Sequence, residues 1–203
     1  MGAPKAEVVL ASANAGKLRE LRALLAGLPV RVVGLDELPG VELPEEGEDY
    51  ATNAIAKARA VAAASRRPAL GDDSGIEVEA LGGAPGPRSA RFGPDAAARN
   101  RRLLEALAGV ATARRGARFV CVVALATPNG DVATARGECA GRILSAPRGA
   151  GGFGYDPVFE PLEAAGRSMA ELSPAEKHRL SHRGRAVRAL LPAIERVLAA
   201  QRP

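Results

Sequence analysis

Residues 70–93 read LGDDSGIEVEALGGAPGPRSARFG, and this stretch determines the fold expected for the chain. Asp72 and Asp73 follow a short apolar run, and apolar and acidic residues then alternate at the period of a strand. Ser74 and Gly75 predict a turn between the two acids and that strand. Two carboxylates beside a hydroxyl can form a solvated turn, or they can bind a hard cation together with phosphate oxygens. The stretch alone leaves both interpretations open.

Other segments predict the elements around these acids. Apolar runs predict strands over 7–11, 30–35 and 118–127, and the residues PNGD after the last run predict a hairpin with 132–141. Apolar periodicity predicts helices over 50–66, over 96–107 and after Ser181. Ser173 with Glu176 forms a capping-box pattern at the start of a further helix. Strands and helices are therefore both expected throughout the chain.

The length of 203 residues suits one domain, and 47% hydrophobic residues are enough for a sizeable core. No apolar run reaches the roughly 18 residues that a membrane-spanning helix needs. The first residues lack the apolar core of a signal peptide, so a cytoplasmic protein without membrane contacts is expected. Cys121 and Cys139 have no His nearby and no metal-ligand spacing, which predicts two small core residues.

The basic residues indicate an anionic ligand without specifying its class. The net charge is +5, but the arginines are spread in pairs, with no long basic run and no aromatics interleaved for base stacking. Only four of the 28 basic residues are lysines, namely Lys5, Lys17, Lys57 and Lys177. Because arginine is used wherever either residue would serve, each remaining lysine is a candidate for a site that needs a compact point charge.

The residues SANAGK at 12–17 connect the first expected strand to a helix. A helix N-terminus after a turn of small residues can bind phosphate, with hydrogen bonds from Ser12 and Asn14 and a charge from Lys17. The spacing is not that of a Walker loop. An ordinary capped helix explains the same residues equally well.

The residues GGFGYDP at 151–157 combine glycines with Phe153, Tyr155 and Asp156. A glycine-rich segment can be a flexible linker. However, the chain contains only six Phe and Tyr residues, and two of them lie here, which favours a loop with a planar face for a ligand. Downstream, His182 and Arg183 stand at the expected start of the last helix, where positive charge opposes the helix dipole. That local conflict indicates a functional role.

Six motifs in order resemble the Ham1-like family, the noncanonical purine nucleoside triphosphate pyrophosphatases or inosine triphosphatases. They are SANAGK (12–17), NAIAKA (53–58), DDSG (72–75), LGGAPG (81–86), GFGYDP (152–157) and SHR (181–183). Each motif is weakly specific, whereas six in order over nearly the whole chain are strongly specific. The resemblance implies a single domain over 1–203, with an α/β fold: a long mixed sheet with flanking helices and two lobes around a central cleft. It also implies a homodimer.

The resemblance further implies hydrolysis of dITP or ITP and of XTP or dXTP to the monophosphate and pyrophosphate, with Mg²⁺ as cofactor. Asp73 would be the catalytic base and a metal ligand. The second metal carboxylate would be Glu45, although a shorter loop leaves Glu46 as the alternative. The residues implied to bind substrate are Ser12, Ala13, Asn14, Ala15, Gly16, Lys17, Ser74, Phe153, Gly154, Tyr155, Asp156, Lys177, His182 and Arg183. Ala13 replaces a glycine that is common in the family, and alanine cannot make a turn that requires positive φ.

Two other functions compete with this interpretation. One is the same chemistry on a different nucleotide, and the other is a basic nucleic-acid-binding domain without catalysis. The second would show steeply salt-dependent DNA binding and would have no use for the two aspartates. A triphosphate, by contrast, needs a divalent ion and lysines before water can approach phosphorus. The expected partner is therefore a purine nucleoside triphosphate, without stable nucleic-acid binding.

Overall fold

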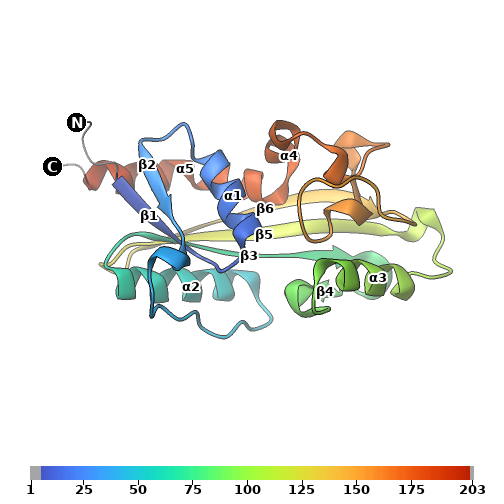
Figure 1. The fold of residues 1–203 in the computed structure, drawn as a ribbon, viewed down its shortest axis with the longest axis horizontal. Helices are drawn as coiled ribbons and strands as arrows, with labels where there is room; N and C mark the ends of the chain where they lie inside the picture. Colours follow the sequence, from blue (N-terminus) through green and yellow to red (C-terminus); the bar gives the residue numbers. More distant parts are fainter. Residues whose placement is uncertain (1–5, 202–203) are drawn as a thin grey trace. The chain divides into compact units, whose positions relative to one another are not determined.

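The computed structural model describes residues 6–201, which form a mixed α/β fold (Figure 1). Lys5 and the rest of the N-terminal segment considered above lie outside the described residues. The strands are β1 (Ala6–Ala11), β2 (Val30–Val33), β3 (Ala69–Val78), β4 (Pro85–Gly86), β5 (Gly116–Ala126), β6 (Val132–Ile143) and β7 (Phe159–Pro161). The α-helices are α1 (Ala15–Leu24), α2 (Tyr50–Ser65), α3 (Ala96–Ala106), α4 (Pro174–Leu180) and α5 (His182–Ala200).

The strands form one sheet in the order β2-β1-β3-β5-β6-β7, and β4 pairs with β3 (Figure 1). β1 runs parallel to both β2 and β3, whereas β4 on β3 and β7 on β6 are antiparallel. The register places Ala11 of β1 opposite Gly71 of β3. The expected long mixed sheet is therefore confirmed. The hairpin between β5 and β6 is confirmed as well, and Thr127 forms backbone hydrogen bonds with nearby residues in its turn.

Two helix caps are those that the sequence predicts, at α4 and α5. Ser173 and Glu176 form the expected capping box at α4, and Asn14 caps α1, as in one of the two interpretations left open for 12–17. The Ser181 hydroxyl accepts from Gly184 N at 3.1 Å in the first turn of α5, as expected of a helix N-cap. α2 ends where Arg66 adopts a left-handed conformation with φ of 53°.

The chain divides into two compact units, in agreement with the two lobes expected. Unit 1 comprises residues 1–73, 122–136 and 186–203, and unit 2 comprises residues 74–121 and 137–185. The chain passes between them four times, so neither unit is a continuous stretch of sequence. The single domain over 1–203 and its central cleft stay predictions.

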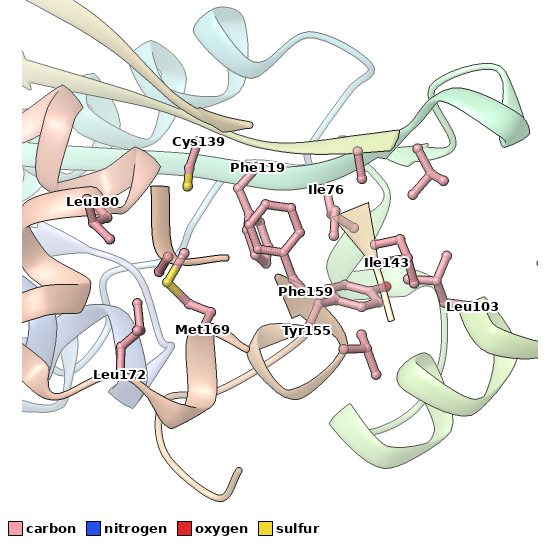
Figure 2. Close-up of a cluster of buried hydrophobic side chains, with 14 of the residues drawn as sticks. Ile76, Leu103, Phe119, Cys139, Ile143, Tyr155, Phe159, Met169, Leu172 and Leu180 are labelled. Atoms are coloured by element: carbon pink, nitrogen blue, oxygen red, sulfur yellow. The ribbon is translucent and has the colours of Figure 1, made fainter. Parts of the chain in front are cut away.

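Unit 2 contains a buried cluster in which aromatic residues pack among aliphatic ones (Figure 2). Phe119 and Phe159 meet edge to face, with ring centroids 4.6 Å apart. Such a pair contributes about 0.5–1.5 kcal/mol beyond the area that it buries. Cys139 lies in the same cluster, and Cys121 is also buried, as expected of small core residues.

The predicted turn after the two acids is wrong. β3 continues without interruption through Asp72, Asp73, Ser74 and Gly75, and most of it is buried. The physical reason is that the charge of the acids is compensated by basic side chains from neighbouring helices, described below. Ionised carboxylates can then occupy the interior of a strand, which they rarely do without partners.

Candidate active site

Six polar side chains of unit 1 converge on the middle of β3. We call them the carboxylate–lysine cluster, which comprises Lys17, Glu46, Asn53, Lys57, Asp72 and Asp73. Lys57 lies at its centre: its Nζ donates to Asp73 Oδ1 at 2.8 Å, to Glu46 Oε1 at 2.8 Å and to Asp72 O at 2.9 Å. These three bonds use all the donors of the ammonium group. Two carboxylates therefore meet on one cation.

Close packing of α2 on β3 produces this arrangement. A Cβ atom on Gly71 would lie 2.0 Å from Ala54 O and 2.9 Å from Ala58 N, so only glycine permits the helix to approach so closely. Asn53 and Lys57 are four residues apart and so project from the same face of α2. Asn53 Nδ2 donates to Asp73 Oδ2 at 3.0 Å, while Lys57 takes the other oxygen. Both oxygens of Asp73 are thereby held.

Asp72 has a different partner. Its side chain is completely buried, and Lys17 Nζ lies 2.6 Å from Asp72 Oδ1. Lys17 also donates to Asp72 O at 3.2 Å. The two adjacent aspartates thus pair with different lysines, Asp72 with Lys17 of α1 and Asp73 with Lys57 of α2.

Burial determines the proton affinity of the central pair. Loss of hydration raises the pKa of the Asp73 carboxyl above its usual value, and the opposing effects of Lys57, Asn53 and Lys17 do not cancel this rise. For Lys57 burial lowers the pKa, but Asp73 and Glu46 outweigh burial and leave the pKa raised. Asp73 is consequently a stronger proton acceptor than an exposed aspartate, which suits a general base.

The loop before α1 takes the capped form in this structure. Asn14 Oδ1 accepts from Gly16 N at 2.8 Å and from Lys17 N at 3.1 Å, and Ser12 Oγ accepts from Asn14 N at 3.2 Å. Among residues 6–201, Arg66 alone has positive φ outside glycine, so Ala13 does not have to make the turn expected to be difficult for it. Ala13, Asn14 and Ala15 are exposed at the end of β1.

In unit 2, the glycine-rich segment is an ordered loop. We call residues 152–156 the glycine loop. Asp156 Oδ2 accepts from Phe153 N at 2.6 Å and from Lys177 Nζ at 2.5 Å. Gly152 has φ of +69°, and a Cβ atom there would lie 2.1 Å from Asp156 Oδ2. Glycine is therefore required where the chain folds back on its own carboxylate.

Phe153 is the half-buried aromatic of this loop, and two cations approach it. Lys177 Nζ lies 4.7 Å and Arg183 Cζ 5.5 Å from the centre of its ring. Arg183 is 1% exposed, and its Nη2 donates to Ser74 Oγ at 2.9 Å. The structure thus brings together Phe153, Asp156, Lys177 and Arg183, four of the residues implied to bind substrate.

Tyr155 and His182 are both buried. Tyr155 is 5% exposed and belongs to the buried cluster of Figure 2, so its ring packs in the core, and its contact with a ligand stays a prediction. The His182 ring stacks on Phe119, with centroids 4.6 Å apart and an interplanar angle of 10°. One face of the imidazole is thereby covered.

Sequence reasoning did not assign a role to Asn53, and it left Glu46 only as an alternative to Glu45. The rarity of lysine made Lys57 a candidate for a site, without giving its role. Each of the three lysines within residues 6–201 pairs with a site carboxylate: Lys17 with Asp72, Lys57 with Asp73 and Lys177 with Asp156. Glu45, by contrast, is exposed.

The sequence model of the Ham1 family matches residues 8–193, which include both groups of polar side chains. This chain belongs to the Ham1 family. The dITP/XTP pyrophosphatase of Deinococcus deserti is 53% identical over 187 residues, covering 91% of this chain and 87% of that protein. The dITP/XTP pyrophosphatase of Streptomyces coelicolor is 46% identical, covering 94% and 98%. A HAM1 protein from Coxiella burnetii has a similar structure, with a TM-score of 0.82 and 39% identity over 94% of this chain and 99% of that one.

A metal site in this Ham1 protein would need ligands beyond the protein. Within the described part of the chain, no three His, Cys, Asp or Glu side chains are grouped to hold an ion. Asp73 and Glu46 nevertheless converge on one ammonium group, so two hard oxygen donors already face a common cation. Mg²⁺ is typically held by one or two carboxylates together with substrate phosphates and water. The donor set therefore fits such an ion.

No helix within residues 6–201 has the length and apolarity to span a membrane.

Proposed function

We propose that this protein hydrolyses noncanonical purine nucleoside triphosphates, such as dITP and XTP, to the monophosphate and pyrophosphate. The observation that carries the proposal is the buried Asp73, held on both oxygens by Asn53 and Lys57 beside Glu46. It occurs in a Ham1 chain about half identical to proteins named dITP/XTP pyrophosphatases. This buried pair of acids with two lysines also argues against a passive nucleic-acid-binding domain, which has no need of it.

The phosphates would bind at the loop before α1. Ser12 and Asn14 offer polar groups there, and Lys17 carries positive charge beside Asp72. Neutralisation of the triphosphate by lysine charge removes the main barrier to the approach of water. Asp73, with its raised pKa, would orient a water molecule and accept its proton as that water attacks the α-phosphorus. Pyrophosphate is then the leaving group.

We propose that Asp73 and Glu46 hold Mg²⁺, with Glu46 preferred over Glu45 because Glu46 shares Lys57 with Asp73. When bound, the ion would neutralise part of the phosphate charge and would lower the pKa of the water that it binds. Lys57 occupies the position between these carboxylates in this structure. Its charge keeps the two acids together.

Recognition of the base would rest on the glycine loop with Lys177, His182 and Arg183. Phe153 would stack on any purine and add affinity without selectivity. Hypoxanthine and xanthine carry a 6-oxo group where adenine carries an amino group. Donors from Arg183, or from the start of α5, would bond that oxygen but would stay unpaired against adenine. Such a mismatch can support about 10⁴-fold rejection. Guanine shares the 6-oxo group, so its rejection would depend on contacts at position 2.

The test is pyrophosphate release from a panel of nucleotides, with and without Mg²⁺. We expect dITP, ITP and XTP to be cleaved with Mg²⁺ and the four standard triphosphates to be cleaved far more slowly. The first products should be the monophosphate and intact pyrophosphate. Diphosphate and orthophosphate as first products would point to attack at the γ-phosphate and overturn the proposal.

The same panel decides the competing functions. Preferential cleavage of a pyrimidine triphosphate would keep the chemistry and change the substrate. Absence of cleavage together with steeply salt-dependent DNA binding would favour a nucleic-acid-binding domain. We further propose that the protein is a homodimer, as the family resemblance implies, which light scattering during gel filtration would test.

A further inference from the structure

Two side-chain contacts hold the glycine loop, one from Asn100 and one from Tyr155. Asn100 of α3 donates from Nδ2 to Gly154 O at 3.1 Å. Tyr155 donates from its hydroxyl to Ser89 O at 2.9 Å, and Ser89 lies in the short helix η3 (Ser89–Arg91). All of these residues belong to unit 2. The contacts therefore connect the loop to a segment 50 or more residues earlier in the chain.

Asn100 is not placed for stability alone. It is 8% exposed, and its Oδ1 is buried without a hydrogen-bond partner among residues 6–201. The amide cannot be turned to pair that oxygen instead, because Gly154 O accepts only and must face the nitrogen. A buried acceptor without a partner costs about 1–3 kcal/mol. A local cost of this kind is typical of a functional position.

Gly154 is the point at which the loop needs an external hold. It has φ of +66°, and a Cβ atom there would meet nothing within 4 Å. The backbone at Gly154 is therefore restrained neither by surrounding atoms nor by a side chain of its own. Its carbonyl is fixed by Asn100, and the amide of the preceding Phe153 is fixed by Asp156. The two bonds together orient the backbone on both sides of the Phe153 side chain.

Tyr155 anchors the other end of the same turn. Figure 2 shows its ring among the labelled side chains of the buried cluster, with Phe159, Ile143 and Leu103 nearby. The hydroxyl of Ser89, whose carbonyl accepts from Tyr155, itself accepts from Ile76 N at 2.9 Å and donates to Gly86 O at 2.6 Å. The loop is thereby tied to β3 close to Ser74, the residue that Arg183 contacts.

We propose that Asn100 is a positioning residue for base recognition. Its hydrogen bond to Gly154 O holds the turn that presents Phe153 to the purine, and the link from Tyr155 to Ser89 supports the same turn. Asn100 does not touch the substrate. This inference rests on the proposed function, because it assigns the base to the glycine loop.

The test compares Asn100→Ala with Leu104→Ala, one turn further along α3. Leu104 is partly buried against the same core and takes no part in the hydrogen bonds that hold the loop, so its replacement controls for loss of packing. Asn100→Ala should raise KM for ITP by about 3- to 10-fold, the factor that corresponds to one net hydrogen bond. Its kcat should change less than about twofold. KM for ATP should rise by a similar factor, because Phe153 stacks on any purine. Leu104→Ala should lower Tm without raising KM.

A second variant and a second measurement guard against a variant that folds poorly. Tyr155→Phe removes only the hydroxyl and keeps the ring in the core, and it should shift KM in the same direction. Amide hydrogen exchange over residues 151–156 should be faster in Asn100→Ala than in Leu104→Ala, whether or not the protein is active. An unchanged KM in Asn100→Ala, or a loss of activity that tracks Tm equally in both α3 variants, would overturn the inference.

The outcomes also separate this inference from the proposed function. A wild-type protein that releases no pyrophosphate from ITP would overturn the function, whatever the variants do. Amide hydrogen exchange at 151–156 would then be the only test of whether Asn100 holds the loop. Faster exchange in Asn100→Ala would support this role of Asn100, and unchanged exchange would contradict it.

Discussion

Lys57 Nζ lies 2.8 Å from Asp73 Oδ1, and each of the two side chains is only 4% exposed. The pair joins α2 to the middle of β3, where a lone carboxylate would be too costly to bury. Because Lys57 also binds Glu46, it keeps two acids together that would otherwise repel each other. The same contact therefore serves the stability of unit 1 and the arrangement of the proposed catalytic acids.

Replacement of Asp73 by asparagine tests the catalytic role. In Asp73→Asn the amide would keep the shape of the side chain but would neither accept a proton nor bind a cation well, so turnover of dITP should fall by at least about 10²-fold. The rate of pyrophosphate release with Mg²⁺ measures the effect, and Tm shows whether the fold is kept. Asp131→Asn, in the exposed turn after β5, is the matched control and should behave as wild type. Near-full activity of Asp73→Asn would mean that the central site is wrongly placed.

Removal of the Lys57 charge should destabilise the protein strongly. Lys57→Met leaves Asp73 buried without its cation, and breaking a buried pair in this way costs about 3–5 kcal/mol. The free energy of unfolding in urea gives the measure. The double variant Lys57→Met with Asp73→Asn should recover part of the loss, because no unpaired charge then remains at Asp73. The exposed pair of Arg101 and Glu105 supplies the comparison, since Arg101→Met should cost less than about 1 kcal/mol.

Selectivity for the base should depend on Arg183. Arg183→Ala removes a buried guanidinium beside Phe153 and Ser74, so kcat/KM for ITP should fall far more than kcat/KM for ATP. Arg185→Ala changes a nearby arginine that binds Glu138 O and Glu163, and it should leave the ratio unchanged. Equal losses on both nucleotides in Arg183→Ala would instead assign the residue to the phosphates.

The start of α4, the helix that carries Lys177, should show pH-dependent stability. The Arg167 guanidinium and the capping bonds of Ser173 lower the pKa of Glu176 to about 2 from its usual 4.5. Folding favours the ionised form of Glu176. Its contribution to the stability of the protein is therefore fully present above pH 4.5 and is lost as the pH falls through about 2. The difference in Tm between wild type and Glu176→Ala should therefore be largest near neutral pH and shrink towards about pH 2. A difference in Tm for Glu176→Ala that is equal near neutral pH and near pH 2 would contradict the prediction.

The elements predicted most accurately are those that local chemistry specifies. The apolar run of β5, the turn residues after it and the capping box of Ser173 and Glu176 act within a few residues of chain. Strand and helix signals of this kind depend on neighbours that the sequence itself displays. The six ordered motifs likewise indicated the Ham1 family and its mixed sheet correctly.

Tertiary structure decided which side chains meet. Asp72 and Asp73 looked like turn residues because the lysines that compensate them lie 55 and 16 residues away in the chain. Tyr155 looked like a ligand face because its sequence neighbours are glycines, whereas its spatial neighbours are core residues brought from other elements. Glu46 contacts Lys57, and Asn100 contacts Gly154, only because helices pack closely against the sheet and the loop. The sequence by itself determined the local elements and the chemical groups available; long-range packing determined which of those groups are paired, because burial without a partner is too costly for a charge.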